Sequence, residues 1–453
     1  MPKDILEKPS HRSQTQISDK LMQHIQNKSL TVGVVGLGYV GMPLLLTMGR
    51  QNIKTIGFDV SDQKVADFNA AKPFLKDLDV DALKMLHENG LTSASSDPNM
   101  LEYADIIVMC VPTPLTRNLD PNMTYIKDAA ETIARYLRPG QMIILESTTF
   151  PGTTEELLKP ILESSGLQSD KDFFIAYSPE REDPGNKTFQ TSTTPKIIGA
   201  DSAIALKLAT AFYDLFIAQT VPVTSTKIAE SAKLMENIFR AVNIGLVNEL
   251  KTVFAVMGID IWDVIEAAKT KPFGFMPFYP GPGIGGHCIP IDPLYLTWKS
   301  NEHKVETRFI RLATEINQSM PRYVVSGLAE ALNDRFAKSI NGSNILIIGL
   351  AYKKNIDDAR ESPSEEVIKL LTQRKANLSY YDPYVRAEHL QDYQHLKKCD
   401  MSQEALQHHD AAIIMTDHDQ IDWKHLAQHV PLIVDTRNAT KHIYKEFDNI
   451  VKL

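Results

Sequence analysis

A glycine-rich turn between a short apolar strand and an apolar helix constrains the fold of this chain more than any other feature. Residues 31–35 have the composition of a buried strand, and residues 36–41 follow it with the letters Gly-Leu-Gly-Tyr-Val-Gly. In such a turn the first glycine permits a tight bend and the second lets a phosphate approach the backbone. The third lets the following helix pack closely on the strand. The pattern predicts the first strand–turn–helix unit of a parallel, doubly wound sheet.

An acidic residue stands at the expected distance after this turn. Asp59 ends the next predicted strand, residues 53–59, where a carboxylate would bind ribose hydroxyls and repel a 2′-phosphate. No arginine follows in residues 60–62, so NAD is favoured over NADP. A glycine turn used only for packing is the alternative. The expected cofactor contacts are Gly36, Gly38, Tyr39, Val40, Gly41, Asp59, Pro112, Thr113 and Thr148.

The rest of the chain alternates in the same way and then repeats the pattern. Further strands are predicted at 106–111 and 141–146, and a second α/β series at 344–349, 377–381, 411–415 and 432–434. Between the two series, residues 225–256 contain no proline and one glycine, which predicts a long helix suited to link domains or pair subunits.

The predicted fold is therefore α/β, with two Rossmann-like doubly wound domains joined by a central helical domain. The expected segments are a polar N-terminal extension at 1–29, a NAD-binding domain at 30–222, a central domain at 223–330 and a second Rossmann-like domain at 331–453.

Composition narrows the function classes. The 453 residues carry a net charge of −8 without a long basic run, which argues against a nucleic-acid partner. The first 28 residues are polar, so neither a secretory signal nor a membrane anchor is expected there. The three cysteines are too few and too scattered for a disulfide framework or a metal cluster. A cytoplasmic protein without metal or membrane partner is expected.

One of those cysteines stands in a distinctive loop. Residues 285–292 have the letters Gly-Gly-His-Cys-Ile-Pro-Ile-Asp, and the glycines would let the backbone approach a ligand. A thiol presented there can add to a carbonyl carbon. The alternative for Cys288 is a buried, inert cysteine, which is the interpretation retained for Cys110 and Cys399.

Seven motifs in order give the chain a specific resemblance. They are Gly-Tyr-Val-Gly at 38–41, Val-Pro-Thr-Pro at 111–114, Glu-Ser-Thr at 146–148, Ser-Pro-Glu-Arg at 178–181, Lys233 with Asn237, Gly-Gly-His-Cys at 285–288, and Gly-Leu-Ala-Tyr-Lys-Lys through Arg-Glu-Ser at 349–362. Nearly the whole chain after residue 30 resembles the UDP-glucose/GDP-mannose dehydrogenase family. The resemblance implies oxidation of a sugar-nucleotide primary alcohol at C6 to a carboxylate, with two NAD and one water consumed.

The same resemblance assigns catalytic roles. Cys288 would add to the aldehyde, giving a thiohemiacetal that is oxidised to a thioester and hydrolysed. Lys233 and Asn237 would stabilise oxyanions, and Asp292 would assist proton transfer and water activation. Thr148 would position water, and Glu180 would act in proton transfer or thioester hydrolysis. Each role has an alternative. Lys233 and Asn237 could belong to a solvated, polar helix face, Asp292 could cap a helix, and Glu180 could form a structural ion pair.

The second α/β domain has Gly349 where a dinucleotide site would have three glycines, so no second NAD is expected. The resemblance implies that this domain holds the UDP moiety instead. The loop at 278–283 would lie over the sugar, because it leads directly into the cysteine loop. Surface ion pairs are the alternative for the basic residues of the domain. The expected substrate contacts are Glu180, Arg181, Lys233, Asn237, Tyr279, Gly285, Lys354, Arg360 and Arg437.

Within the family, residues 178–186 and 278–293 most resemble the bacterial branch that oxidises UDP-N-acetylglucosamine for surface polysaccharide precursors. The sister branch that acts on UDP-N-acetylmannosamine shares Gly-Gly-His-Cys but usually diverges just after it. UDP-N-acetylmannosamine and UDP-glucose are the alternative substrates. A two-electron hydroxyacid dehydrogenase and a non-catalytic nucleotide-binding protein are more remote alternatives. His287 is either a pH-sensitive site component or a hydrogen-bonded loop residue. A homodimer or higher homo-oligomer is expected from the long helix.

Overall fold

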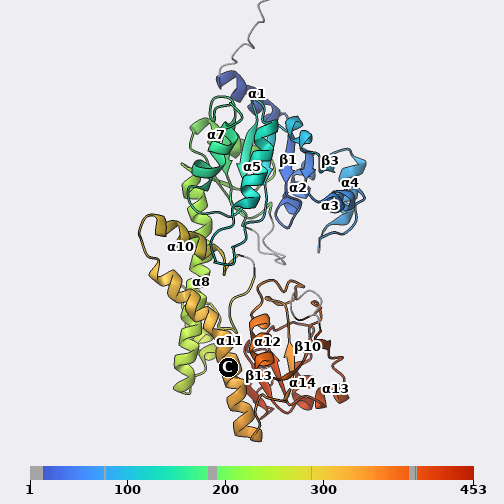
Figure 1. Cartoon of the computed structure of the whole chain (residues 1–453), viewed down its shortest axis with the longest axis vertical. Helices are drawn as coiled ribbons and strands as arrows, with labels where there is room; N and C mark the ends of the chain where they lie inside the picture. Colours follow the sequence, from blue (N-terminus) through green and yellow to red (C-terminus); the bar gives the residue numbers. More distant parts are fainter. Residues whose placement is uncertain (1–13, 76–77, 182–190, 287, 387–392, 394) are drawn as a thin grey trace, which may run out of the picture. The chain divides into compact units, whose positions relative to one another are not determined.

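The structure is a computed structural model that describes residues 14–75, 78–181, 191–286, 288–386, 393 and 395–453. Contacts divide the chain into two compact units, with the division after Met235. Figure 1 shows the elements of both units in the order of the sequence. His287 lies outside the described residues, so the prediction about it has no structural counterpart.

The first unit contains an eight-stranded sheet in the order β3-β2-β1-β4-β5-β6-β7-β8. Its strand pairs are parallel except for β6 and β7, which are antiparallel. The strands are β1 (Thr31–Val35), β2 (Lys54–Phe58), β3 (Thr92–Ser95), β4 (Ile106–Met109), β5 (Met142–Leu145), β6 (Phe174–Tyr177), β7 (Lys196–Gly199) and β8 (Thr220–Val223). The helices are α1 (Gln14–Gln26), α2 (Gly41–Gly49), α3 (Asp62–Asn69), α4 (Val80–Glu88), η1 (Pro98–Tyr103), α5 (Thr124–Tyr136), η2 (Thr154–Leu158), α6 (Lys159–Glu163) and α7 (Ala203–Tyr213).

Each face of this sheet has its own hydrophobic core, because the side chains of each strand alternate between the two faces. In β1, Val32 and Val34 belong to the core formed with α1, α2 and α7, whereas Val35 belongs to the core formed with α5 and α6. Successive side chains of a strand point to opposite faces, so a strand between two helical layers must be apolar throughout. This explains the continuous apolar run from which the sequence predicted a buried strand.

The N-terminal helix α1 belongs to the first core. Its residues Ile17, Leu21 and Ile25 are at most 6% exposed and pack in the same cluster as α2 and α7. Three apolar residues spaced by four places form one stripe of a helix. The described part of the predicted polar extension therefore contains an amphipathic helix, whose polar residues lie on its outer face.

The second unit combines long helices with a six-stranded parallel sheet in the order β11-β10-β9-β12-β13-β14. Helix α8 (Thr226–Val256) crosses the point of division of the chain. The other helices are α9 (Ile261–Ala268), α10 (Asp292–Glu302), α11 (Arg308–Phe336), α12 (Pro363–Gln373), α13 (Gln403–Gln407) and α14 (Trp423–His429). The strands are β9 (Asn344–Ile348), β10 (Asn377–Tyr381), β11 (Lys397–Lys398), β12 (Ala411–Ile414), β13 (Ile433–Asp435) and β14 (Ile450–Lys452).

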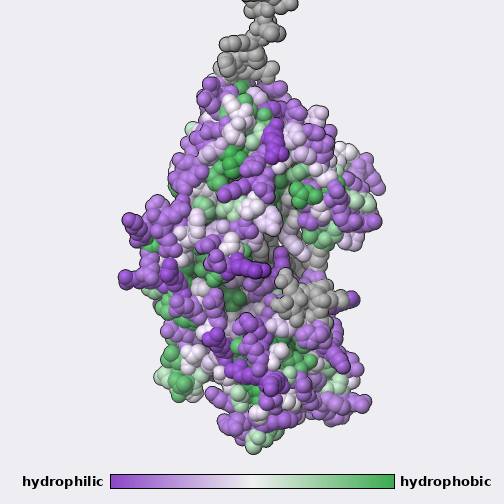
Figure 2. Space-filling model, viewed as in Figure 1, coloured by the Kyte–Doolittle hydropathy of each residue, from purple (hydrophilic) through white to green (hydrophobic). Residues whose placement is uncertain are grey.

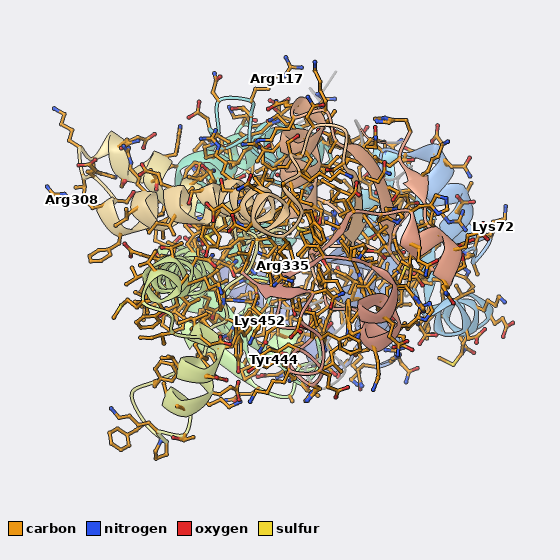
Figure 3. The ribbon with its side chains drawn as sticks, turned by 90° about the horizontal axis from the view of Figure 1, so that it is seen from below. Lys72, Arg117, Arg308, Arg335, Tyr444 and Lys452 are labelled. Atoms are coloured by element: carbon orange, nitrogen blue, oxygen red, sulfur yellow. The ribbon has the colours of Figure 1, made fainter. Side chains whose placement is uncertain are left out.

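Polar contacts at the end of this sheet attach it to the central helices. The Lys452 ammonium in β14 forms an ion pair with Asp260, the N-cap of α9, and lies 4.6 Å from the centroid of the Tyr444 ring. Burial alone would raise the pKa of Asp260, but the hydrogen bond from Lys452 lowers it. Figure 3 shows Lys452 and Tyr444 close together, with Arg335 of α11 nearby. Because both side chains are largely buried, removal of one partner would leave the other charge unpaired.

The two-domain α/β architecture with a central helical region confirms the predicted fold class. Strand β1 matches its prediction, β10 does too, and the long helix begins one residue later than predicted. Strands β2, β4, β5, β9 and β12 end one or two residues inside their predicted limits, as is usual for assignments based on hydrogen bonds, and β13 is shifted by one residue toward the C-terminus. The sequence did not predict β3, β6, β7, β8, β11 and β14. The predicted boundaries at 222 and 330 stay predictions.

Candidate active site

The glycine turn lies where the strand order of the first sheet reverses, between β1 and β4. Gly36 has φ of +99°, and a Cβ there would lie 2.6 Å from the Cys110 carbonyl oxygen. A Cβ at Gly41 would overlap the Gly36 carbonyl, whereas one at Gly38 would meet nothing within 4 Å. The first glycine therefore permits the turn, the third permits close helix packing, and the second faces open space where a ligand can approach. Ligands of open α/β sheets bind at this crevice.

The Asp59 carboxylate is anchored at the rim of this turn. Its Oδ2 accepts the Leu37 N–H at 3.0 Å, and its Oδ1 accepts the Ser61 N–H at 3.0 Å. Lys64 of α3 lies 3.3 Å from the same carboxylate. Asp59 is 7% exposed, so these hydrogen bonds hold its side chain in one orientation. Its role in binding the cofactor remains a prediction.

The turn after β5 contains a buried polar network ahead of Thr148. Glu146 accepts from Tyr213 Oη at 2.5 Å and from Lys196 Nζ at 3.1 Å. Burial raises the pKa of Tyr213 well above its ordinary value, and the Glu146 carboxylate raises it further, so the phenol remains a donor. Thr148 is half-buried in a turn whose neighbours are buried. These contacts fix the conformation of the turn, and Thr148 is more accessible to solvent than the residues on either side of it.

The Ser-Pro-Glu-Arg segment after β6 is joined to helix α8. Lys233 Nζ donates to the Glu180 carbonyl at 2.6 Å and lies 3.7 Å from its Oε2. Lys233 is 6% exposed, so it is not the solvated lysine of the alternative interpretation. The structure thus brings Lys233 and Glu180 together. A structural ion pair of this kind was the alternative to a catalytic role for Glu180. That pair does not exclude a catalytic role, and both roles stay predictions.

The cysteine loop leads directly into α10. The Cys288 carbonyl accepts the N–H groups of Ile291 at 3.1 Å and Asp292 at 2.8 Å, and its thiol is exposed and in no disulfide. Asp292 does not cap α10 with its side chain; its Oδ2 instead accepts from Asn237 Nδ2 at 2.5 Å. Asp292 is 3% exposed and Asn237 7%, so a buried amide–carboxylate pair lies one short turn from an accessible thiol. A thiol near a carboxylate and an amide donor is suited to covalent catalysis on a carbonyl.

The two glycines of this loop have a packing role that the sequence did not reveal. A Cβ at Gly285 would lie 2.6 Å from Tyr352 Cβ and 2.8 Å from the Glu361 carbonyl oxygen. Gly286 has φ of +91°, and a Cβ there would lie 2.9 Å from the Tyr352 ring. Approach of a ligand was the expected reason for these glycines. The structure shows that Tyr352 and Glu361 of the same chain already occupy the space beside Gly285.

A cavity of about 620 Å³ adjoins the loop on the side formed by α11 and the start of α12. Its lining includes four carboxylates and one guanidinium, those of Glu315, Glu361, Glu365, Glu366 and Arg322. An excess of carboxylates repels a pyrophosphate. This cavity therefore does not have the charge that a nucleotide diphosphate would need.

The second sheet uses its equivalent of Asp59 differently. Asp382 follows β10 as Asp59 follows β2, and its Oδ2 accepts the N–H groups of Leu350 and Ala351 at 2.7 and 3.1 Å. Its carboxylate also accepts from His418 Nε2 at 3.0 Å, and it is fully buried. Asp59 makes the equivalent contact with the Leu37 N–H. The two carboxylates therefore differ in the His418 bond and in the complete burial of Asp382, which leaves it no exposed surface for ribose hydroxyls. That the second domain does not take a dinucleotide stays a prediction.

The basic residues predicted for the substrate lie in two environments. Lys354 pairs with Asp419 at 3.1 Å, and Arg360 with Asp358 at 2.6 Å, all on the surface of the second unit. Arg437 is different, because it is partly buried and its Nε donates to the Met415 carbonyl at 2.9 Å. Burial lowers the pKa of Arg437, while nearby carboxylates act in the opposite direction. The surface ion-pair interpretation therefore fits Lys354 and Arg360 but not Arg437.

The Arg437 guanidinium packs against the loop before the cysteine, since a Cβ at Gly281 would overlap it. In the same loop the Tyr279 ring stacks on Trp262 at 5.6 Å, and its hydroxyl donates to Glu266 at 3.0 Å. Tyr279 is 42% exposed. Contact of these residues with a substrate stays a prediction.

Comparison with known proteins decides the family. Residues 30–217 match the NAD binding domain of the UDP-glucose/GDP-mannose dehydrogenase family, residues 227–319 its central domain, and residues 346–442 its UDP binding domain. The chain belongs to the UDP-glucose/GDP-mannose dehydrogenase family. It is an NAD-dependent UDP-sugar dehydrogenase, which confirms the predicted cofactor and enzyme class.

Individual members of the family are similar over most of their length. The UDP-N-acetyl-D-glucosamine 6-dehydrogenase of Pseudomonas aeruginosa is 37% identical over 80% of this chain and 84% of its own. The UDP-N-acetyl-D-mannosamine dehydrogenase of Pyrococcus horikoshii is 32% identical over 91% of this chain and 96% of its own. A solved structure of the UDP-D-ManNAc dehydrogenase from that organism covers 93% of this chain and 99% of its own, with a TM-score of 0.85 and 31% identity.

Two further observations concern the described part of the dehydrogenase. No helix there is long and apolar enough to cross a membrane. No group of three or more His, Cys, Asp or Glu side chains in that part has an arrangement that would hold a metal ion.

Sequence reasoning missed two buried polar clusters of this dehydrogenase. The first is Glu146 with Lys196 and Tyr213, and the second is Asp382 with His418. A lysine at the start of an apolar strand and an aspartate directly after one were the available signals. Neither signal identifies the partner, because the partner residues are distant in the sequence.

Proposed function

We propose that this dehydrogenase oxidises the C6 hydroxyl of UDP-N-acetylglucosamine to a carboxylate in two steps on one thiol, for a surface polysaccharide precursor. The observation that supports the two steps is the exposed Cys288 thiol beside the buried Asn237–Asp292 pair. The similarity to the Pseudomonas enzyme supports this sugar. The similarity to the Pyrococcus enzyme favours UDP-N-acetylmannosamine, which differs in configuration at C2, as the second candidate.

The proposed roles follow the order of the reaction. The glycine turn of Gly36, Gly38 and Gly41 would hold NAD, which would supply the hydride acceptor for both oxidations.

The proton that the C6 hydroxyl loses in the first oxidation passes to Asp292 and on to solvent. The Cys288 sulfur then adds to the aldehyde carbon, and the thiol proton passes to the new hydroxyl as the C=O π bond opens. The second oxidation releases that hydroxyl proton through Asp292 as well. Lys233 and Asn237, one turn apart on α8, stabilise the negative charge that develops on the oxygen.

Hydrolysis completes the proposed reaction. Water attacks the thioester carbon, the bond to sulfur breaks, and the carboxylate and the free Cys288 thiol are produced. Thr148 positions that water, and Glu180 or Asp292 accepts its proton. A hydroxyl has too high a pKa to act as the base itself, which is why a carboxylate is assigned that role.

Purified protein mixed with NAD and one UDP-sugar at a time tests this function. We expect two NADH per sugar consumed and the highest kcat/KM with UDP-N-acetylglucosamine among UDP-glucose, UDP-N-acetylgalactosamine and UDP-N-acetylmannosamine. One NADH per sugar would contradict the four-electron chemistry. A preference for UDP-N-acetylmannosamine would replace the proposed sugar and leave the chemistry intact.

We also propose that two copies of the chain associate through α8. Phe239, Leu246 and Val253 are 46%, 50% and 44% exposed and follow one another at intervals of seven residues, which places them on one stripe of the helix. In Figure 2 hydrophobic side chains lie on the surface at the lower left, over the lower part of α8. A self-complementary apolar stripe of this kind suits a twofold interface.

Light scattering tests the association. The unmodified chain is expected at twice the monomer mass or more, and Leu246→Glu at the monomer mass, because a carboxylate in the stripe would have to lose its water. Tyr103→Glu is the matched control, since Tyr103 is 69% exposed on the first unit and far from α8 in the sequence. A monomeric unmodified chain would refute the proposal.

A further inference from the structure

Lys196 is a buried cation at the start of β7 that no predicted role uses. Its side chain is 8% exposed, and its ammonium lies 3.1 Å from Glu146 Oε2, 3.4 Å from the Pro179 carbonyl and 5.2 Å from the centroid of the Tyr213 ring. Buried charges retain one geometry only when hydrogen bonds and opposite charges satisfy them. The Lys196 ammonium is therefore fixed relative to both Glu146 and Pro179.

These two contacts belong to different catalytic segments. Glu146 stands two residues before Thr148, in the turn after β5, and Pro179 stands directly before Glu180, in the segment after β6. Lys196 thus connects the backbone that carries the Thr148 hydroxyl with the backbone that carries the Glu180 carboxylate.

The residues beside Lys196 hold the same segment. Ser178 Oγ donates to the Ile197 carbonyl at 2.8 Å, and Arg181 Nη1 donates to the Pro195 carbonyl at 2.6 Å. Strand β7 is the antiparallel neighbour of β6, which is why its first residues lie alongside the chain that leaves β6. Three contacts from residues 195–197 therefore fix residues 178–181, and the Lys196 contact extends to the turn after β5. A small cavity is lined by Glu146, Glu180 and Lys196 together.

We infer that Lys196 is a positioning residue that sets the separation of Thr148 and Glu180 for hydrolysis of the thioester. It acts through the backbone of both segments and does not itself contact the substrate. The inference rests on the proposed function, which assigns water positioning to Thr148 and proton transfer to Glu180. A displacement of about 1 Å in such a group lowers a rate by up to about 100-fold.

The test is Lys196→Met, which retains the length of the side chain and removes its charge. We expect kcat to fall about 10- to 100-fold, with one NAD bound per chain and the NAD dissociation constant changed less than about twofold, within ordinary context dependence. Lys196→Arg is expected to recover part of kcat. Lys207→Met on α7, an exposed lysine of the same unit, is the control and is expected to match the unmodified enzyme.

Two measurements separate positioning from a loss of folding. Lys196→Met leaves the Glu146 carboxylate without its cation, so Glu146→Gln with Lys196→Met should restore the midpoint of thermal unfolding but not kcat. In an acid-quenched reaction the mass of the intact Lys196→Met chain should increase by the acyl group, as in Glu180→Gln, because hydrolysis has become slow.

Unchanged kcat in Lys196→Met would overturn the inference, as would recovery of both stability and kcat in the double variant. Failure of the proposed function has a different signature, which is full turnover by Cys288→Ala. An inactive Cys288→Ala together with a fully active Lys196→Met would overturn this inference alone.

Discussion

Cys288→Ala is expected to lower steady-state NADH production by about 1,000-fold or more, because removal of a covalent nucleophile has effects of this size or larger. Without the thiol no adduct forms from which a second hydride can leave. The first oxidation does not require the sulfur, so the variant should release at most one NADH per sugar and should retain UDP-sugar. The measurement is NADH absorbance together with analysis of the sugar product. Binding of NAD should be unchanged, because the glycine turn lies in the other unit.

Cys399→Ala is the matched control for this prediction. Cys399 belongs to the same unit, but it is 7% exposed and packs in the core between β9, β12 and α14. Burial raises the pKa of its thiol, so it is a poor nucleophile. Its loss should reduce stability slightly and leave two NADH per sugar. Two NADH per sugar from Cys288→Ala would contradict the thioester route.

Asp382→Ala is expected to lower the free energy of unfolding of the second unit by several kcal/mol, because each buried donor left without an acceptor costs about 1–3 kcal/mol. Its carboxylate accepts backbone N–H groups from Leu350, Ala351, Tyr384 and Val385 and a ring N–H from His418. Alanine would leave these donors buried without an acceptor. The loop after β9 would lose its anchor, so the KM for the UDP-sugar should also rise. Denaturant unfolding and steady-state kinetics provide the two measurements.

The pH dependence gives this prediction a second test. Burial alone would raise the pKa of Asp382, but the hydrogen bonds from His418 and the backbone lower it overall. A lowered folded-state pKa means that stabilisation is present above the unfolded value of about 3.9 and is lost as pH falls through the folded value. The unmodified protein should therefore lose stability in this acid range more steeply than Asp382→Ala.

Asp419→Ala provides the comparison for Asp382. Asp419 also binds the loop after β9, through Lys354 and Asn355, but its side chain is 66% exposed. An exposed pair contributes at most about 1 kcal/mol. Equal losses of stability for the two variants would contradict the importance assigned to the buried carboxylate.

Most of the fold could be predicted because it is encoded locally. Continuous apolar runs identified β1, β4, β5 and β12, since a strand covered by helices on both faces has no polar side. The one long segment without proline identified α8. The sequence did not predict helix α1 clearly, because polar residues separate the buried Ile17, Leu21 and Ile25 along the chain. The antiparallel β7 carries no local mark of its direction, since direction depends on which strand it pairs with.

The sequence predicted which residues belong to the candidate site, but it did not predict most of the contacts between them. Gly36, Gly38 and Gly41 have the separate environments that their motif implies. Asp292 was left between helix cap and catalytic carboxylate, and the structure shows it bonded to Asn237 instead of capping α10. That contact joins residues 55 positions apart in the sequence. No spacing rule predicts such a contact.

The sequence by itself determined the α/β class, the NAD turn, the family and the cysteine on which the proposed chemistry depends. These features depend on neighbours in the chain, through side-chain periodicity and the conformational freedom of glycine. The tertiary structure alone decided that Gly285 and Gly286 make room for Tyr352, that Asp382 is turned inward on its own loop, and that Lys196 connects the turn after β5 with the segment after β6. Each of these depends on which distant groups become buried together, because a buried polar group must find its partner wherever the fold places one.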